Sequence, residues 1–192
     1  DAEELRGIGR MSWNSTRLEN VLTLQRGHDL PDSRRQDGDI PVVSSSGITG
    51  RHNESKAKAP GVVTGRYGTI GEVFYVEEDY WPLNTALYVT DFKGNHPRFV
   101  AYLLRNVLKD YQSDKAAVPG VNRNVLHELK VRCPDTHLQQ RIVDILSSYD
   151  DLIENNRRRI VLLEESARQL YQEWFVRLRF PGREHTRIAK GV

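Results

Sequence analysis

Short runs of apolar residues, separated by polar turns, fill the first two thirds of the chain and predict β-strands. The runs are rich in β-branched and aromatic residues and end at Gly, Pro, Asn or Asp, which is typical of strands. They occupy residues 21–24, 40–43, 62–64, 72–76, 85–89 and 129–131.

One helix is expected within this region. Pro97 suits the first position of a helix, because a proline there loses no hydrogen bond that the helix would make. Apolar residues then return every three or four positions, which places them on one helical face. They are Val100, Leu103, Leu104, Val107, Leu108 and Tyr111. The region is therefore predicted to be a β-rich domain with one packed helix.

The pattern changes at Pro134, beyond which a long helix is predicted. Residues 136–178 contain neither Pro nor Gly, and Thr136 with Gln139 three positions later predicts a capping box at the helix start. Apolar positions then alternate at spacings of four and three, which is typical of a coiled-coil seam. The seam comprises Ile142, Leu146, Tyr149, Ile153, Asn156, Ile160, Leu163, Ala167, Leu170 and Trp174.

The sequence leaves open whether this helix is broken. Ser148 with Asp151 three positions later offers a second N-cap, so a short helix could instead abut a longer one. An unbroken helix over 136–178 would be about 65 Å long, which exceeds the expected width of the preceding domain. The seam then needs a second helix to cover it, and Asn156 would fix the register of that pairing.

These patterns predict a mixed α/β fold of the α+β class, in which a β-rich domain precedes a long coiled-coil helix. We expect residues 11–134 to form the domain, 135–180 the helical spacer and 181–192 an irregular tail. Residues 1–10 are expected to be an added or disordered leader, because Met11 is the only methionine and suits a natural start.

Composition excludes several classes of protein. The chain has 192 residues, a net charge of +2 and a mean hydropathy of −0.60. Its longest apolar run, at 99–104, is too short to cross a bilayer, so a membrane-spanning protein is excluded. The single cysteine, Cys133, excludes an internal disulfide and a multi-cysteine zinc module. The first ten residues lack the apolar core of a secretory signal, and a cytoplasmic protein is expected.

The common catalytic motifs are not matched, and we predict neither a catalytic residue nor a metal site. The glycine-rich segment 65–71 has the spacing G-x-x-G-x-x-G, which fits no nucleotide-binding fingerprint and is interpreted as a hairpin turn. One enzymatic alternative stays open. Asp32, Glu54 and Lys56 follow the order of a Mg²⁺-dependent nuclease site, although Glu54 and Lys56 lie in a charged stretch that is poor in strand-forming residues.

Arginine gives the strongest positive signal, since 21 of the 28 basic residues are arginines. Arginine suits bidentate contacts with phosphate and with guanine. Several arginines lie in or beside expected loops with Ser, His, Tyr and Asn, which predicts a surface that binds DNA through a few placed side chains. The predicted contacts are Arg34, Arg35, Ser45, Ser46, Arg51, His52, Arg66, Tyr67, Asn122 and Arg123.

Six ordered blocks resemble the specificity subunit of type I restriction-modification systems. Five resemble its target recognition domain, at residues 13–27, 38–47, 65–71, 81–85 and 118–123. The sixth is similar to the family's helical conserved region and comprises residues 139–146 and 170–175, followed by Phe180-Pro181-Gly182. The resemblance covers about residues 12–185, and its strength lies in the order of the blocks.

The resemblance implies a DNA-sequence reader without catalytic residues of its own. In this family two recognition domains each bind one half of a split double-stranded DNA target, and two long antiparallel helices set the distance between the halves. Methyltransferase subunits dock on this scaffold and methylate adenine with S-adenosylmethionine. A restriction subunit, a motor-nuclease that uses ATP and Mg²⁺, completes the complex. This chain is expected to bind none of these cofactors itself.

The chain has one recognition domain and one helical region, where the complete subunit has two of each. It is expected to be either a half subunit or the first part of a longer one, and both predict a homodimer through antiparallel helices. The predicted contacts are Leu146, Tyr149, Ile153, Asn156, Ile160, Leu163, Leu170 and Trp174. Besides the nuclease, two alternatives stay open: a segment of a single-chain restriction-modification enzyme, and a coiled-coil adaptor whose domain binds protein.

Overall fold

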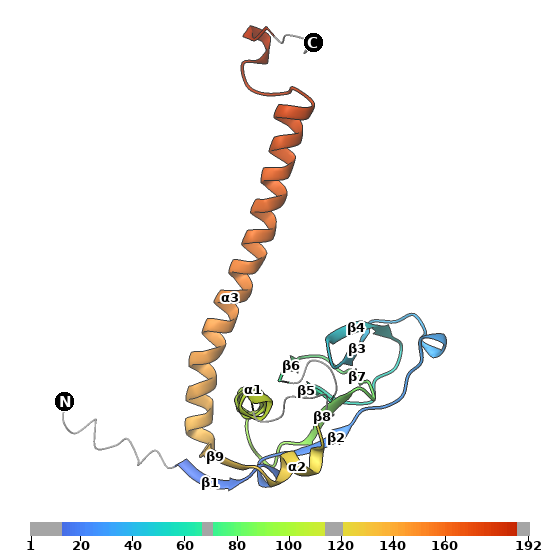
Figure 1. Ribbon diagram of the computed structural model, residues 1–192, viewed down its shortest axis with the longest axis vertical. Helices are drawn as coiled ribbons and strands as arrows, with labels where there is room; N and C mark the ends of the chain where they lie inside the picture. The colour runs from blue at the N-terminus through green and yellow to red at the C-terminus, as the bar shows by residue number, and fades with distance from the viewer. Residues whose placement is uncertain (1–12, 67–70, 114–120, 188–192) are drawn as a thin grey trace, which may run out of the picture. The chain divides into compact units, whose positions relative to one another are not determined.

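The computed structural model describes residues 13–66, 71–113 and 121–187. Contacts between residues divide the chain into two compact units, Asp1–Val143 and Asp144–Val192, here called unit 1 and unit 2. Unit 1 contains the described strands and the α-helices α1 and α2, and the long helix α3 begins in unit 1 and continues into unit 2 (Figure 1). The predicted α+β class is confirmed.

The described strands of unit 1 form three sheets. The four-stranded sheet is antiparallel throughout and has the order β2 (Thr23–Arg26), β8 (Ala86–Asp91), β5 (Gly61–Gly65), β6 (Val73–Val76). The three-stranded sheet has the order β4 (Gly47–His52), β3 (Ile40–Ser44), β7 (Trp81–Pro82), in which β7 runs parallel to β3. The third sheet pairs β1 (Trp13–Arg17) with β9 (Lys130–Pro134).

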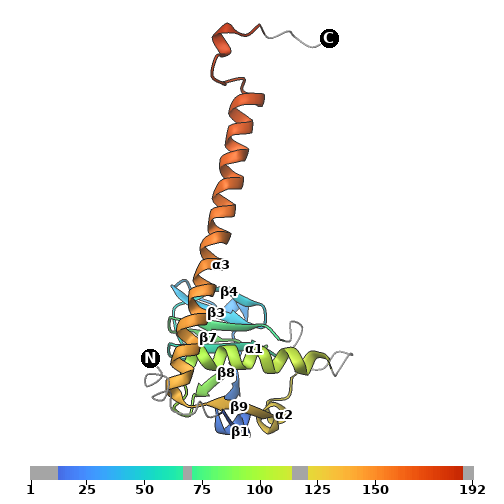
Figure 2. The ribbon, with the colours of Figure 1, turned by 90° about the vertical axis from the view of Figure 1, so that its left-hand side faces the viewer.

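The core of unit 1 forms where helix α1 (Pro97–Ser113), seen along its length in Figure 2, packs on β5 and β6, which lie beside it in Figure 1. Pro97 is the first residue of α1, as predicted, and Val100, Leu104 and Leu108 are each 0% exposed. They meet apolar residues of the sheet such as Val62 in one cluster. Burial of such side chains is the dominant favourable term in folding. The packing of α1 therefore holds the four-stranded sheet in place. The side chain of Tyr111, the last residue of the predicted face, lies outside the described part.

The six predicted strands are confirmed, and the described residues contain three further strands. β1, β4 and β7 lack the apolar runs that predict strands, and they form by pairing with β9 and β3. The sequence predicts a hairpin turn at 65–71. β5 and β6 do pair antiparallel on either side of it, while residues 67–70 lie outside the described part.

A short helix, α2 (Arg123–Glu128), was not predicted, because Asn122 and Arg123 were placed beside a loop. The side chain of Asn122 caps α2 by accepting a hydrogen bond from the Asn124 N–H at 3.0 Å. Leu126 anchors α2 in the core with 0% exposure. One apolar anchor in six residues gives no periodic pattern, which explains the missed helix.

Helix α3 (Thr136–Tyr171) is unbroken, so the alternative of two abutting helices is wrong. The hydroxyl of Ser148 donates to the carbonyl oxygen of Asp144 one turn earlier at 2.9 Å and caps no new helix. The predicted capping box of Thr136 and Gln139 is also wrong. Asp135 Oδ1 accepts from the Leu138 N–H at 2.9 Å, and the Gln139 side chain is buried.

The end of α3 differs in detail from the predicted end at Leu178. After Tyr171 one π-helical turn, Gln172–Val176, continues the helix, and the Arg177 N–H donates to the Gln172 carbonyl oxygen at 2.8 Å. Leu178 has φ +56°, a left-handed conformation that ends helices. A short 3-10 helix, Arg183–His185, follows. Within the described residues, no helix combines the length and apolar character needed to cross a membrane.

We expect His127 to make unit 1 less stable as the pH falls. His127 Nε2 accepts a hydrogen bond from the Leu24 N–H at 3.0 Å, which requires that nitrogen to be unprotonated. Burial and the nearby Arg123 guanidinium lower the pKa of His127 below 6.5, although Glu19 opposes this. Below its ordinary pKa the unfolded chain therefore binds more protons than the folded chain. The free energy of unfolding should decrease as the pH falls from 6.5 towards the lower folded pKa.

Urea unfolding at about pH 7.5 and about pH 5.5 measures this decrease. The control is His127→Gln, whose side-chain oxygen can still accept from Leu24 but does not titrate. The variant should lose less stability than the wild type over the same interval, and an equal loss in both proteins would contradict the assignment.

Candidate nucleic-acid interface

Arg34 and Arg35 lie at the end of a 3-10 helix, Asp32–Arg34, and differ in their surroundings. The Arg34 guanidinium is 3.7 Å from the Asp29 carboxylate, and its side chain is 70% exposed. Arg35 pairs with Asp32 at 3.0 Å, and its side chain is only 23% exposed. Arg34 is therefore the better placed of the two to meet a ligand.

Arg35 packs along the backbone of β4. It donates to the Thr49 carbonyl oxygen at 3.4 Å, and a Cβ added at Gly50 would lie 2.9 Å from its Nη1. Glycine at position 50 thus leaves room for the guanidinium. Arg35 supports the loop that presents Arg34, and the sequence did not distinguish these two neighbours.

Arg51 and His52 end β4 and also have different environments. The exposed Arg51 side chain donates to the Asp39 carbonyl oxygen. His52 is 5% exposed, accepts from the Gln36 N–H at 3.1 Å and packs edge-on against Trp81 at 5.2 Å between ring centres. A ring so enclosed presents little surface to DNA, so its visible role is to join the 36–39 loop to β7.

Ser45 and Ser46 form the tight turn between β3 and β4, at the opposite end of β4 from His52. The Ser46 N–H donates to Ser44 Oγ at 3.1 Å, and the two hydroxyls of Ser44 and Ser46 lie 3.0 Å apart. Gly47 has φ +96°, which glycine adopts at no steric cost. The turn is thereby fixed with Ser46 exposed.

Arg66, Asn122 and Arg123 form a second group. The Val121 N–H donates to the Arg66 carbonyl oxygen at 2.8 Å, which joins the end of β5 to the start of α2. Arg123 is exposed at the first position of α2, whereas the Asn122 oxygen is engaged in the cap. Tyr67, also predicted to contact DNA, lies outside the described residues.

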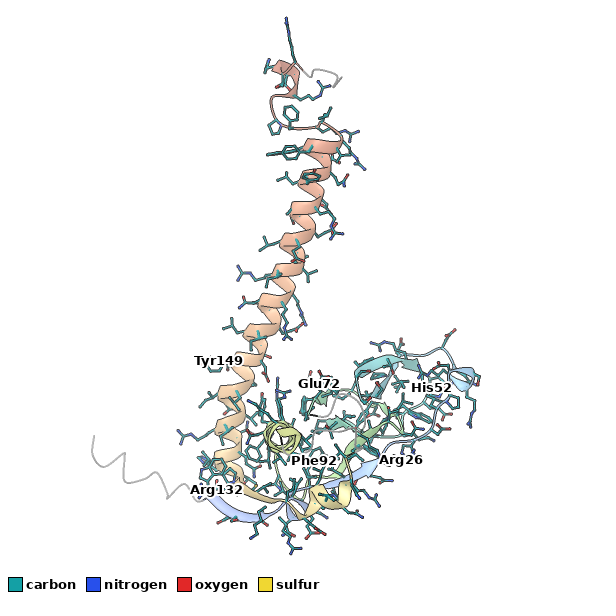
Figure 3. All side chains as sticks on the ribbon, viewed as in Figure 1. Arg26, His52, Glu72, Phe92, Arg132 and Tyr149 are labelled. Carbon is teal, nitrogen blue, oxygen red and sulfur yellow. The ribbon has the colours of Figure 1, made fainter. Side chains whose placement is uncertain are left out.

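A third arginine-bearing cluster was missed from the sequence. Arg26 Nε donates to the Asn84 carbonyl oxygen at 3.2 Å, and Asn84 Nδ2 donates to Asp29 Oδ1 at 2.8 Å. Gly27 permits this approach, because a Cβ there would lie 2.2 Å from the Leu83 carbonyl oxygen. In Figure 3 the labelled Arg26 and His52 lie towards the same end of unit 1, away from Arg132. Two blocks of the resemblance, 13–27 and 81–85, contain most residues of this cluster, but the sequence does not show that they meet.

The residues of the nuclease alternative have separate surroundings. The Asp32 carboxylate pairs with Arg35, and Lys56 Nζ lies 5.0 Å from the centre of the Trp81 ring. Glu54 is exposed and lies outside the strands. Across the described ranges, no group of three or more His, Cys, Asp or Glu side chains is placed to hold a metal ion.

The predicted seam of α3 lies at the surface. Its large apolar residues in unit 2 are exposed, and the most exposed, Leu163, reaches 68%. The others are Leu146, Tyr149, Ile153, Ile160, Leu170 and Trp174, and the polar seam residue Asn156 is exposed as well. A contiguous apolar stripe of this kind marks an interaction surface.

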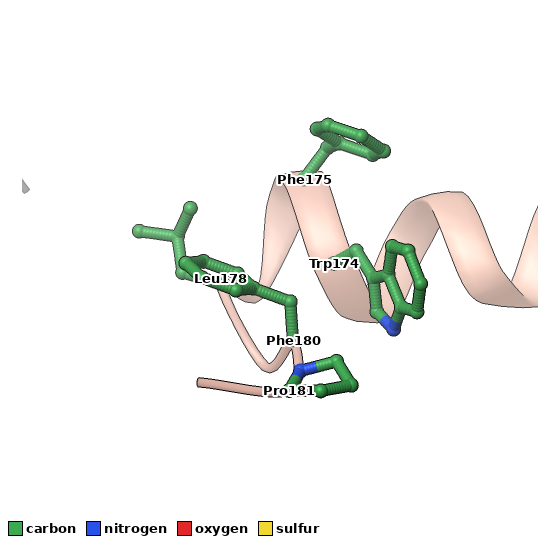
Figure 4. A pocket seen from close by; sticks show the side chains of 5 residues that line it. All are labelled: Trp174, Phe175, Leu178, Phe180 and Pro181. Carbon is green, nitrogen blue, oxygen red and sulfur yellow. The ribbon is translucent and has the colours of Figure 1, made fainter. Parts of the chain in front are cut away.

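Past the end of α3 the chain turns back and forms an apolar hollow of about 370 Å³ (Figure 4). Its lining residues are Trp174, Phe175, Leu178, Phe180 and Pro181. The left-handed Leu178 produces the turn that brings Phe180 and Pro181 back towards Trp174. The hollow belongs to the same end of the helix as the last seam residue.

Residues 11–165 match the model of the type I restriction modification DNA specificity domain. The chain belongs to this specificity family. The match spans the strands of unit 1 and most of α3, so both parts described above belong to the family pattern.

Three similar members of the specificity family illustrate the match. The MjaIX specificity subunit of Methanocaldococcus jannaschii is 33% identical over 78 residues, which are 41% of this chain and 18% of that protein. The HindI specificity subunit of Haemophilus influenzae is 29% identical over 116 residues, 55% of this chain and 25% of that protein. The solved S subunit from M. genitalium has a TM-score of 0.72 at 15% identity, over 88% of this chain and 47% of that one. The chain thus spans less than half the length of that solved subunit.

We expect Arg35 to stabilise this specificity domain and Arg34 to contribute little to its stability. Arg35→Ala removes a largely buried side chain with its hydrogen bond and ion pair, and should lower the free energy of unfolding by about 1–2 kcal/mol. Arg34→Ala removes an exposed side chain and should change it by less than about 0.5 kcal/mol. Chemical denaturation of both variants measures the difference, and equal effects would refute the distinction.

Proposed function

We propose that this chain is the DNA-sequence-recognition subunit, or half subunit, of a type I restriction-modification complex, and that it binds one half of a bipartite target. The observation that carries this proposal is the family match over both unit 1 and α3. The exposed arginines beside β4 and α2 support unit 1 as the DNA-binding part. The exposed seam of α3 supports a scaffolding role for the helix.

The proposed DNA contacts are the accessible members of the predicted set. Arg34 and Arg51 lie beside one sheet, and Arg66 and Arg123 are joined through Val121. Guanidinium groups at separate loops can grip phosphates on both strands while one of them reads a base edge. The exposed Ser46 and the newly found Arg26 extend this surface.

The catalytic steps are assigned to partner subunits. A methyltransferase subunit with S-adenosylmethionine would methylate adenine, and a restriction subunit with ATP and Mg²⁺ would cleave DNA. This chain would supply no catalytic residue and act in the cytoplasm, where its DNA target is found. Its contribution is to hold the methyltransferase on a chosen sequence, while the enzyme extrudes the base.

The experiment that tests this function is co-purification with the methyltransferase subunit, followed by mapping of methylated adenines. Methylation confined to one split sequence supports the proposal. A complex that does not form, or that methylates without sequence preference, would refute it.

We expect single arginine substitutions to weaken the complex on its own target. Arg66→Ala or Arg123→Ala should cost about 1–3 kcal/mol of specific binding if the residue reads a base edge. Affinity for random duplex should change less, and both affinities should fall steeply with salt because phosphate contacts release counterions. Competition binding of the methyltransferase complex to target and random duplexes measures both effects. Arg132→Ala, an exposed arginine on β9, is the control.

We also propose that two copies pair their α3 seams antiparallel, which would bury Ile153, Ile160 and Leu163. Ile160→Asp places a charge in the seam and should shift the sedimentation coefficient towards that of a monomer. Val161→Asp is a matched control, because Val161 is 64% exposed against 55% for Ile160 and lies about 100° away around the helix. A wild-type chain that stays monomeric at high concentration would remove the homodimer.

A further inference from the structure

Gln139 is an unusual residue for a helix surface, because its polar side chain is 1% exposed. It lies at the end of the first turn of α3, inside unit 1. A buried amide without partners would destabilise the fold, so such a group is retained when directional bonds hold it. The contacts of Gln139 show which bonds these are.

Every polar group of the Gln139 side chain has a partner in another part of unit 1. Its Nε2 donates to Asn95 Oδ1 at 2.7 Å and to the Pro134 carbonyl oxygen at 2.9 Å. Its Oε1 accepts from the His96 N–H at 2.9 Å. The partners come from the loop before α1 and from the end of β9, so one side chain joins α3 to two other elements.

Asn95 extends this junction into the rest of unit 1. Its Nδ2 donates to the Val21 carbonyl oxygen at 2.9 Å and to the Phe92 carbonyl oxygen at 3.0 Å. The polar contacts of the Gln139–Asn95 pair therefore bind α3, β9 and the segments before β2 and α1 into one buried network. Such networks fix a unique arrangement when all their members are satisfied.

Apolar packing at the same place is less directional. Val143 is buried in the core and Ile142 packs against it, one turn beyond Gln139. Contacts of this kind resist separation but tolerate rotation and sliding better than a three-way hydrogen bond does. The later residues of α3 belong to unit 2.

Because α3 is long, a small tilt at this junction produces a large displacement at the other end of the helix. With 36 residues, α3 is about 54 Å long. A tilt of about 4° at one end then moves the other end by about 4 Å, slightly more than the base-pair step of about 3.4 Å. A helix that measures the distance between DNA half-sites needs an anchor stiffer than that.

We propose that Gln139 is a positioning residue that fixes the direction of α3 at its start, and thereby sets the number of base pairs between the two halves of the target. This inference rests on the proposed function. Gln139 contacts no DNA in this role and acts through α3 alone.

The test replaces Gln139 by methionine, which keeps the length of the side chain and removes its hydrogen bonds with Asn95, Pro134 and His96 and its weaker 3.5 Å contact with Cys133 Sγ. Gln140→Met is the matched control, because the same change falls on the neighbouring exposed position. The methyltransferase complexes of both variants and the wild type are assayed on duplexes with the mapped target and with its spacer shortened or lengthened by one base pair.

The wild type and Gln140→Met should prefer the natural spacer. In Gln139→Met the ratio of methylation rates between natural and altered spacers should fall by about tenfold, the scale of one or two directional hydrogen bonds, while both half-site sequences stay the same. An unchanged ratio in a folded Gln139→Met complex would overturn the proposal. A wild-type complex that methylates no split sequence would instead overturn the proposed function.

A measurement without DNA tests the role of Gln139 independently of the proposed function. Nitroxide labels at Glu78→Cys in unit 1 and Asn155→Cys in unit 2 report their distance distribution by pulsed EPR, with labelled chain diluted into unlabelled chain. Burial raises the pKa of the Cys133 thiol, so the label prefers the introduced cysteines. The distribution should be about twofold broader in Gln139→Met than in Gln140→Met or the wild type. Equal widths would overturn the proposal.

If Gln139→Met does not fold, Asn95→Leu replaces it in both assays. This change removes the Asn95 acceptor and the two bonds that Asn95 donates to the Val21 and Phe92 carbonyl oxygens. Gln139 keeps its bonds with Pro134 and His96 and its contact with Cys133. The same loss of spacer discrimination and the same broadening are expected in smaller measure. Wild-type behaviour in both assays would refute the role of the junction.

Discussion

The uncovered apolar face of α3 is the constraint on which the rest of the protein depends. An isolated helix gains little stability from its own hydrogen bonds, and most helices in proteins persist because a partner covers one face. Unit 1 covers the first two turns of α3, up to Val143. The remaining turns expose Ile153, Ile160 and Leu163 by half or more of their surface. The stability of unit 2 should therefore depend on protein concentration, whereas that of unit 1 should not.

The sequence predicts those elements whose own side chains favour them. β3, β5, β6 and β8 are runs of apolar, mostly β-branched or aromatic residues, and their strands follow from the pattern alone. β1 and β4 have the sequences WNSTR and GITGRH, which favour no strand by composition. They become strands because β9 and β3 lie beside them, and one of these partners is more than a hundred residues away in the chain. Long-range pairing leaves no mark in a local window.

The candidate site was predictable in residue type and less so in role. The α3 seam follows from the spacing of apolar residues along the chain, so the sequence alone predicts which face of the helix they share. Arg34 and Arg35 are identical neighbours in the sequence, and only their surroundings in the fold distinguish them. Arg35 is 23% exposed and is bonded to Asp32 and to the Thr49 carbonyl oxygen, so it supports the loop that presents Arg34. The Arg26 cluster joins segments that lie 58 residues apart. The spacing of Thr136 and Gln139 predicts a capping box, but Asp135 caps the helix instead. The Gln139 amide is then available to bond with Asn95 in the interior of unit 1.

Unit 1 contains separate apolar clusters instead of one continuous core. Leu30 forms a small cluster with Val42 and Trp81 of the sheet that carries Arg51, while α1, α2 and the start of α3 share a larger one. Substitutions near the small cluster can change the shape of the loops that carry Arg34 and Arg51. The larger cluster then still holds the start of α3. Under the proposed function, the DNA contacts of Arg34 and Arg51 and the direction of α3 depend on different clusters. Those contacts and the spacing between the half-sites can then change independently as the protein evolves.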